Sequence, residues 1–218
     1  MRKVRGPLPI VPERIFMTST TLVITSSPVG KHSVSTLLLD DLLERRSKTH
    51  PHERVVVRDL AAMGGSLPHV DGTFADAIFI TPDQRTVEQQ QGLTLSDELV
   101  NELIAATTVV IASPMYNRTV PSSLKAWIDH VVRPGLTFTY DEKGRKGLLS
   151  GKKAILLCAT GGVYSKGDGV AEDFLVPYLR CILEFMGVKD VSVYRAEGLA
   201  IDYEGAVRSA KELLAVEN

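Results

Sequence analysis

Residues Thr107–Asp129 read TTVVIASPMYNRTVPSSLKAWID, and this stretch decides the predicted fold. β-branched and apolar residues fill Thr108–Ala112, a run of the length of one buried strand. Pro114 ends the run, because proline cannot donate a hydrogen bond at the centre of a sheet. Polar residues then form a loop at Met115–Val120, and Pro121 suits the first turn of a helix, where its missing N–H costs nothing. The stretch therefore predicts a strand, a loop and a helix, and such loops bind ligands in open parallel sheets.

The same alternation of short apolar runs with amphipathic segments continues along the chain. Further strands are predicted at Thr21–Thr25, Val55–Val57, Lys153–Ala159 and Val191–Tyr194. Helices are predicted at Ser33–Arg46, Thr94–Ala106, Asp173–Met186 and Tyr203–Val216, and a polar helix or part-helix at Thr81–Gln91. Residues Ala61–Phe79 are expected to be irregular, and Thr137–Gly144 to begin a small hairpin excursion. Strands that alternate with helices predict an α/β fold with a doubly wound, five-stranded parallel sheet in three layers.

Loops with an unusual residue composition follow the first, third and fourth of the predicted strands. These loops read SSPVGKHSVS (residues 26–35), PMYNR (114–118) and ATGG (159–162). In the strand order 2-1-3-4-5, the three strands are neighbours and flank the point where the order reverses. We therefore predict this order, with all three loops along one edge of the sheet.

The composition limits the class of protein. A chain of 218 residues with 44% hydrophobic and 23% charged residues is typical of one globular domain. The formal net charge of −1 argues against nucleic acid or an acidic membrane surface as a partner. No apolar run approaches the ~20 residues of a membrane span, so the cytoplasm is the expected compartment. Cys158 and Cys181 lie in apolar runs and are interpreted as buried, reduced thiols.

The first residues do not fit the pattern downstream. Met1–Phe16 is rich in arginine and proline and has no continuous apolar core for a secretory signal. We interpret it as a disordered leader, followed by a single domain at residues 17–218. A start codon assigned too early is the alternative, because Met17 directly precedes the first predicted strand.

Serines surround the start of the first predicted helix, at Ser26, Ser27, Ser33 and Ser35. Hydroxyls and free N–H groups at a helix N-terminus form a phosphate site. A nucleoside-triphosphate P-loop is excluded, because Thr25 stands where the motif needs its first glycine and His32 stands where it needs Ser or Thr. The simpler alternative is that the serines only cap the helix.

The other two loops are suited to a flat ligand. Met115–Asn117 offers backbone groups and an amide to the edge of a heteroaromatic ring, while Gly161–Gly162 lets the backbone approach such a ring closely. A simple glycine turn is the alternative reading of the latter pair. Combined with one phosphate site, the loops predict a mononucleotide with a large ring, FMN. The histidines are scattered singly, and we expect no metal site.

The pattern PMYN…P..LK.WID…R.G.TF.Y…G..GLL.GKKA, followed by GG-V-Y, resembles the FMN-dependent NADH-azoreductase family. Members of that family also reduce quinones and have the flavodoxin-like fold, and the resemblance runs from about Thr21 to Gly198. The resemblance implies cofactor contacts at Ser27, Ser33, Val34, Ser35, Met115, Tyr116, Asn117, Arg118, Ala159, Thr160, Gly161 and Gly162. It also implies a substrate pocket formed by Asn117, Arg118, Tyr140 and Phe185, with Phe185 contributed by the second subunit of a homodimer. The family typically has Phe where this chain has Arg118.

The resemblance also implies a mechanism. Non-covalent FMN performs the redox chemistry, so no catalytic side chain is expected. NADH or NADPH donates electrons and leaves, and a quinone or azo compound then accepts them, which is ping-pong turnover. Two alternatives stay open: a non-enzymatic flavodoxin-type electron carrier, against which the nearly neutral charge argues, and a flavin-free interaction module.

Overall fold

A computed structural model of the protein describes residues 19–63 and 67–217. The expected leader at Met1–Phe16 lies outside these residues. The strands are β1 (Thr20–Thr25), β2 (Arg54–Asp59), β3 (Thr108–Pro114), β4 (Phe138–Asp141), β5 (Gly144–Gly147), β6 (Lys153–Thr160) and β7 (Asp190–Glu197). The α-helices are α1 (Val34–Thr49), α2 (Gly72–Ala77), α3 (Val87–Ala105), α4 (Ser122–Val131), α5 (Val176–Phe185) and α6 (Tyr203–Leu214), and short 3-10 helices are η1 (Gly30–His32), η2 (Pro82–Gln84) and η3 (Gly167–Glu172).

A five-stranded parallel sheet in the order β2-β1-β3-β6-β7 forms the centre of the fold. This is the predicted order 2-1-3-4-5, because β4 and β5 form a separate antiparallel hairpin. β3 lies between β1 and β6, and all its residues from Thr108 to Pro114 are buried. A strand covered on both faces needs a continuous apolar run, which explains the sequence pattern at its centre.

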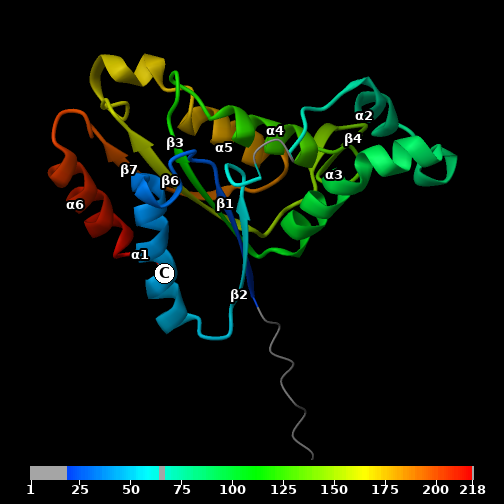
Figure 1. Ribbon diagram of the computed structural model, residues 1–218. Coiled ribbons are helices and arrows are strands. Elements are labelled where there is room, and N and C mark those ends of the chain that lie inside the picture. The colour runs from blue at the N-terminus through cyan, green and yellow to red at the C-terminus, as the bar shows by residue number, and fades with distance from the viewer. Residues whose placement is uncertain (1–18, 64–66, 218) are drawn as a thin grey trace, which may run out of the picture.

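Helices pack against both faces of the sheet. Figure 1 shows α1 and α6 on one side, and α3, α4 and α5 on the other. Successive residues of β1 serve the two faces: Leu22 and Ile24 pack in the core beneath α3, α4 and α5, whereas Val23 packs in the core beneath α1 and α6. Within the described residues, no helix is long and apolar enough to cross a membrane.

The helical segments predicted at Thr81–Gln91 and Thr94–Ala106 are joined in the structure, because α3 runs without a break from Val87 to Ala105. The sequence places a capping box at Thr94, but α3 begins at Val87, and Thr94 lies within it and bonds back to the carbonyl of Gln90. The capping box is formed by Thr86 and Gln89, whose side chains each accept a hydrogen bond from the other residue's backbone N–H. The region Ala61–Phe79, expected to be irregular, contains the short helix α2.

The two cysteines differ in burial. Cys158 is fully buried in β6, and burial raises the pKa of its thiol to about 12. Cys181 is exposed, which corrects the expectation that it is buried. Leu179 and Leu183 face the core from α5, so a residue midway between them at helical spacing faces outward.

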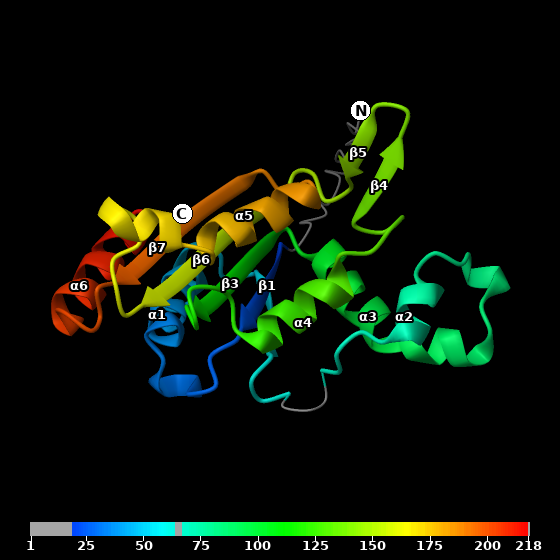
Figure 2. The ribbon, with the colours of Figure 1, turned by 90° about the horizontal axis from the view of Figure 1, so that it is seen from above.

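The hairpin β4–β5 stands away from the sheet, beyond the C-terminal end of α5, as Figure 2 shows. The backbones of Gly147 and Gly187 lie so close together there that a Cβ on Gly147 would collide with the backbone of Met186 and Gly187. The N–H of Leu149 also donates to the carbonyl of Met186 at 2.8 Å. The hairpin is therefore fixed to the end of α5, at the edge of the sheet where β6 and β7 begin.

Candidate functional site

The three predicted loops meet at the carboxyl edge of the sheet, where β1, β3 and β6 end. Backbone hydrogen bonds hold them in register, from the N–H of Ser26 to Ala112 at 3.3 Å and from the N–H of Met115 to Ala159 at 2.9 Å. The Ser26 hydroxyl donates to the Ser113 hydroxyl at 3.0 Å, and both residues are fully buried. The sequence prediction that these loops share one edge is confirmed by the strand order.

The loop after β1 presents buried hydroxyls at the start of α1. Ser27 is 3% exposed, and its Oγ has no hydrogen-bond partner among the described residues. The hydroxyls of Ser33 and Ser35 are 2.9 Å apart. Ser33 is the N-cap of α1, yet its side chain accepts no N–H of that helix. Capping alone therefore does not explain these serines, whereas the oxygens of a phosphate would satisfy the Ser27 hydroxyl.

The loop after β3 is a tight turn. Tyr116 and Thr119 exchange two backbone hydrogen bonds of 3.0 Å, which close a turn around Asn117 and Arg118. Both central residues are left-handed, with φ of 48° for Asn117 and 70° for Arg118. Asn suits this geometry, whereas glycine is usual at the second position, so Arg118 sits in a strained conformation. Tyr116, Asn117 and Arg118 are exposed at the tip of the turn.

The loop after β6 is fixed by its own backbone. The Thr160 hydroxyl donates to the carbonyl of Gly162 at 2.8 Å. The N–H groups of Gly198 and Ala200 donate to Gly162 and Gly161 at 2.9 and 3.0 Å. A Cβ on Gly162 would lie 3.2 Å from the ring of Tyr164, so glycine lets this ring pack over the loop. Gly161 is exposed beside it, as a close approach to a flat ligand requires.

A cleft of about 1090 Å³ opens beside the turn at Asn117. Tyr116 and Asn117 line it together with Ser26 of the first loop. Its other walls include His69 from the segment after β2 and Tyr178 from α5, which the sequence analysis did not identify. No local signal marks these two, because Tyr178 lies in a helix read as apolar packing and His69 lies in a segment read as irregular.

Tyr140 and Phe185 lie elsewhere in the same chain. Their rings both contact Phe138, with centroids 5.9 and 4.7 Å away, and Arg145 lies over the Phe185 ring at 4.5 Å. The hairpin and the end of α5 are at the edge where strands begin, so these aromatics are opposite the three loops. One chain therefore does not bring Tyr140 and Phe185 to its own loops.

Known proteins resemble this chain over nearly its whole length. A model of the flavodoxin-like fold family matches residues 19–217. An FMN-dependent NADH:quinone oxidoreductase of Rhizobium johnstonii is 46% identical over 191 residues, covering 88% of this chain and 92% of that protein. The chain belongs to this family. The resemblance inferred from the sequence is thereby confirmed, and a protein of the same name from Herminiimonas arsenicoxydans is 45% identical, with coverages of 87% and 91%.

Solved structures of the family have the same fold. An azoreductase from Bacillus anthracis superposes with a TM-score of 0.83 at 28% identity, covering 91% of this chain and 97% of that one. An FMN-dependent NADH-azoreductase from Bacillus anthracis, solved in complex with FMN, gives a TM-score of 0.80 at 27% identity, with coverages of 91% and 98%.

Proposed function

We propose that this protein is an FMN-dependent oxidoreductase that uses NADH to reduce quinones and to cleave aromatic azo bonds. The observation that carries the proposal is the unpartnered, buried hydroxyl of Ser27 beside the Ser33–Ser35 pair, at the edge where the other two loops end. The names of the relatives support it independently, because they combine FMN, NADH and quinone or azo reduction.

The chain offers a place for each part of FMN. The phosphate would bind at Ser27, Ser33, Val34 and Ser35, and the ring between the turn at Met115–Arg118 and the loop at Ala159–Gly162. FMN, when bound, supplies the transfer of electrons from a nicotinamide to an acceptor. The two loops would hold the ring beside the cleft that Tyr116 and Asn117 line. We propose that NADH or NADPH and the acceptor use this cleft in turn, as ping-pong turnover requires.

A second copy of the chain would complete the site. Tyr140 is 69% exposed on the hairpin and lies with Phe185 opposite the loops of its own chain. In a homodimer, these aromatics would instead form a wall over the loops of the other subunit. A two-fold dimer places each hairpin on its partner in the same way, so both sites are completed at once.

The experiment is a cofactor analysis followed by an anaerobic titration. The purified protein should be yellow and release FMN, not FAD, on heating. NADH alone should bleach the flavin, and 1,4-benzoquinone should restore its colour. An electron carrier would keep its colour with NADH alone, and a flavin-free module would be colourless. Either result would contradict the proposal.

A further inference from the structure

Arg118 forms an ion pair with Glu172, the last residue of η3. The pair links the turn after β3 to η3, in the segment that follows the loop at Ala159–Gly162. The two side chains are 52% and 47% exposed, so solvent reaches both charges. The guanidinium therefore has a fixed counter-ion at the rim of the site.

Backbone hydrogen bonds hold the two segments together at the same place. The N–H of Phe174 donates to the carbonyl of Arg118 at 3.0 Å, and the Thr119 hydroxyl donates to the carbonyl of Phe174 at 3.2 Å. These contacts fix Glu172 beside Arg118. The pair of Lys48 and Glu44 within α1 is more exposed, with side chains 69% and 70% exposed.

A second ion pair lies at the cleft, on α4. Lys125 lines the cleft and pairs with both carboxylate oxygens of Asp129 at 2.5 and 2.7 Å. Arg118 is the cation on the turn itself, directly after Asn117, which lines the cleft, and loss of its partner Glu172 would leave a net positive charge there. The charge of Arg118 is offset by Glu172.

We propose that Arg118 and Glu172 act as one charge-balanced pair at the rim of the acceptor site, and that Glu172 determines how strongly the enzyme selects for charge on the acceptor. The inference rests on the proposed function and adds a specificity residue to it. With Glu172 present, Arg118 attracts an anionic acceptor only weakly. Without the carboxylate, the guanidinium is free to bind a sulfonate or carboxylate group.

The test compares two acceptors of matched ring chemistry, anthraquinone-2-sulfonate and a neutral anthraquinone. Glu172→Gln should raise the ratio of their kcat/KM values, anionic over neutral, by about three- to tenfold at low salt, as expected for a solvent-exposed charge. The gain should shrink at high ionic strength. Arg118→Gln should shift the ratio in the opposite direction, and the double variant should return it towards the wild-type value.

Asp168→Asn is the matched control, because it removes a carboxylate from the same 3-10 helix. Within the part of the chain that the structure describes, Asp168 forms no ion pair. Its substitution should leave the ratio of efficiencies within about twofold of the wild type. If Glu172→Gln and Asp168→Asn change the ratio equally, the pair has no special role and the inference is wrong.

A binding measurement separates this inference from the proposed function. Anthraquinone-2-sulfonate is titrated into the oxidised flavoprotein without NADH, and the dissociation constant is read from the flavin spectrum. Glu172→Gln should tighten binding by about the same three- to tenfold factor. Absence of NADH-dependent turnover in the wild type would overturn the proposed function, whereas an unchanged dissociation constant in Glu172→Gln would overturn the role of the pair.

Discussion

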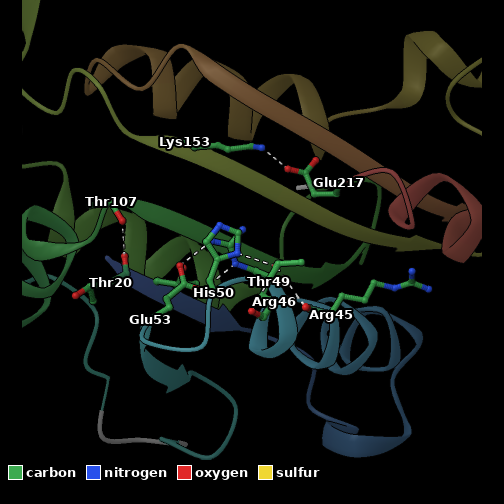
Figure 3. A network of polar contacts seen from close by, with 10 residues as sticks. Thr20, Arg45, Arg46, Thr49, His50, Glu53, Thr107, Lys153 and Glu217 are labelled. Atoms are coloured by element: carbon green, nitrogen blue, oxygen red, sulfur yellow. Dashed lines mark hydrogen bonds and ion pairs between the residues drawn. The ribbon is translucent and has the colours of Figure 1, made fainter. Parts of the chain in front are cut away.

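Arg46, near the end of α1, holds Glu53 in a two-point ion pair, with Nε to Oε2 at 2.9 Å and Nη2 to Oε1 at 2.7 Å (Figure 3). Thr21 of β1 also donates to Oε1 at 2.8 Å. The two charged side chains are only 8% and 3% exposed. Because Glu53 directly precedes β2, one carboxylate joins α1, β1 and β2 at the edge of the sheet opposite the site.

Glu53→Gln should lower the free energy of unfolding by about 3 kcal/mol, because it leaves the buried guanidinium of Arg46 without a counter-ion. Urea unfolding followed by circular dichroism measures the loss. The control is Glu44→Gln, the same substitution in the exposed pair with Lys48 on α1, which should leave the stability nearly unchanged. Equal effects of the two substitutions would show that the burial of the Arg46 pair contributes nothing.

The same pair predicts a dependence of stability on pH. Burial by itself raises the pKa of Glu53, but hydrogen bonds from Arg46 and Thr21 outweigh it, and the net pKa is lowered below 4.5. A carboxyl whose pKa is lower in the folded state stabilises the fold above its unfolded pKa, and this contribution is lost as the pH falls through the folded-state pKa. The stability difference between wild type and Glu53→Gln should therefore be constant near neutral pH and shrink below pH 4.5.

The sequence predicts the parts of the fold that local patterns specify. Thr108–Ala112 is a buried strand because helices cover both faces of the sheet at its centre, and such a run is visible without the structure. The sequence pattern divides α3 into a polar part-helix at Thr81–Gln91 and a helix from Thr94, because the first turns are solvated and no apolar periodicity joins the two segments: Val87 is 69% exposed. The pair of Arg118 and Glu172 joins segments distant in the sequence, and no spacing rule connects them. Cys181 shows the same limit, since an apolar run does not tell which face of the helix a residue occupies.

Ser27→Ala should weaken the binding of FMN more than that of riboflavin, because only FMN carries the phosphate. Loss of one charge-assisted hydrogen bond costs about 1.5–3 kcal/mol, or roughly ten- to hundredfold in the dissociation constant. Fluorescence titration of the apoprotein with each flavin measures the difference. The matched control is Ser26→Ala, whose hydroxyl bonds to Ser113 within the protein, and which should affect both flavins equally. Equal weakening of both flavins by Ser27→Ala would place its hydroxyl away from the phosphate.

The homodimer can be tested by complementation. Ser27→Ala impairs the cofactor site of its own chain, and Phe185→Ala removes a wall that the proposal assigns to the site of the partner. Mixed dimers would contain one intact site, so co-refolding the two variants should recover roughly a quarter of the wild-type turnover. Sedimentation measures the dimer directly. A fully active monomer, or no recovery on mixing, would contradict the shared site.

Arg118→Phe replaces the guanidinium by an aromatic ring and removes the charge that balances Glu172. The unpaired carboxylate of Glu172 should repel an anionic acceptor, with an effect of about threefold on kcat/KM at low salt, as expected for solvent-exposed charges. The kcat/KM with an anionic acceptor should therefore fall relative to that with a neutral quinone. If Arg118 contacts the extra phosphate of NADPH, kcat/KM for NADPH should also fall relative to that for NADH. Steady-state kinetics at low and high salt measure both ratios.

The backbone of Arg118 supplies the control for this substitution. At a φ of 70°, a phenylalanine is strained, whereas glycine adopts this conformation at no steric cost. Arg118→Gly should thus change the acceptor ratio as Arg118→Phe does, but should unfold at a higher temperature than Arg118→Phe because the turn is relaxed. If both variants lower the efficiency with anionic and neutral acceptors equally, and the ratio of NADH to NADPH efficiencies stays constant, Arg118 takes no electrostatic part in the reaction.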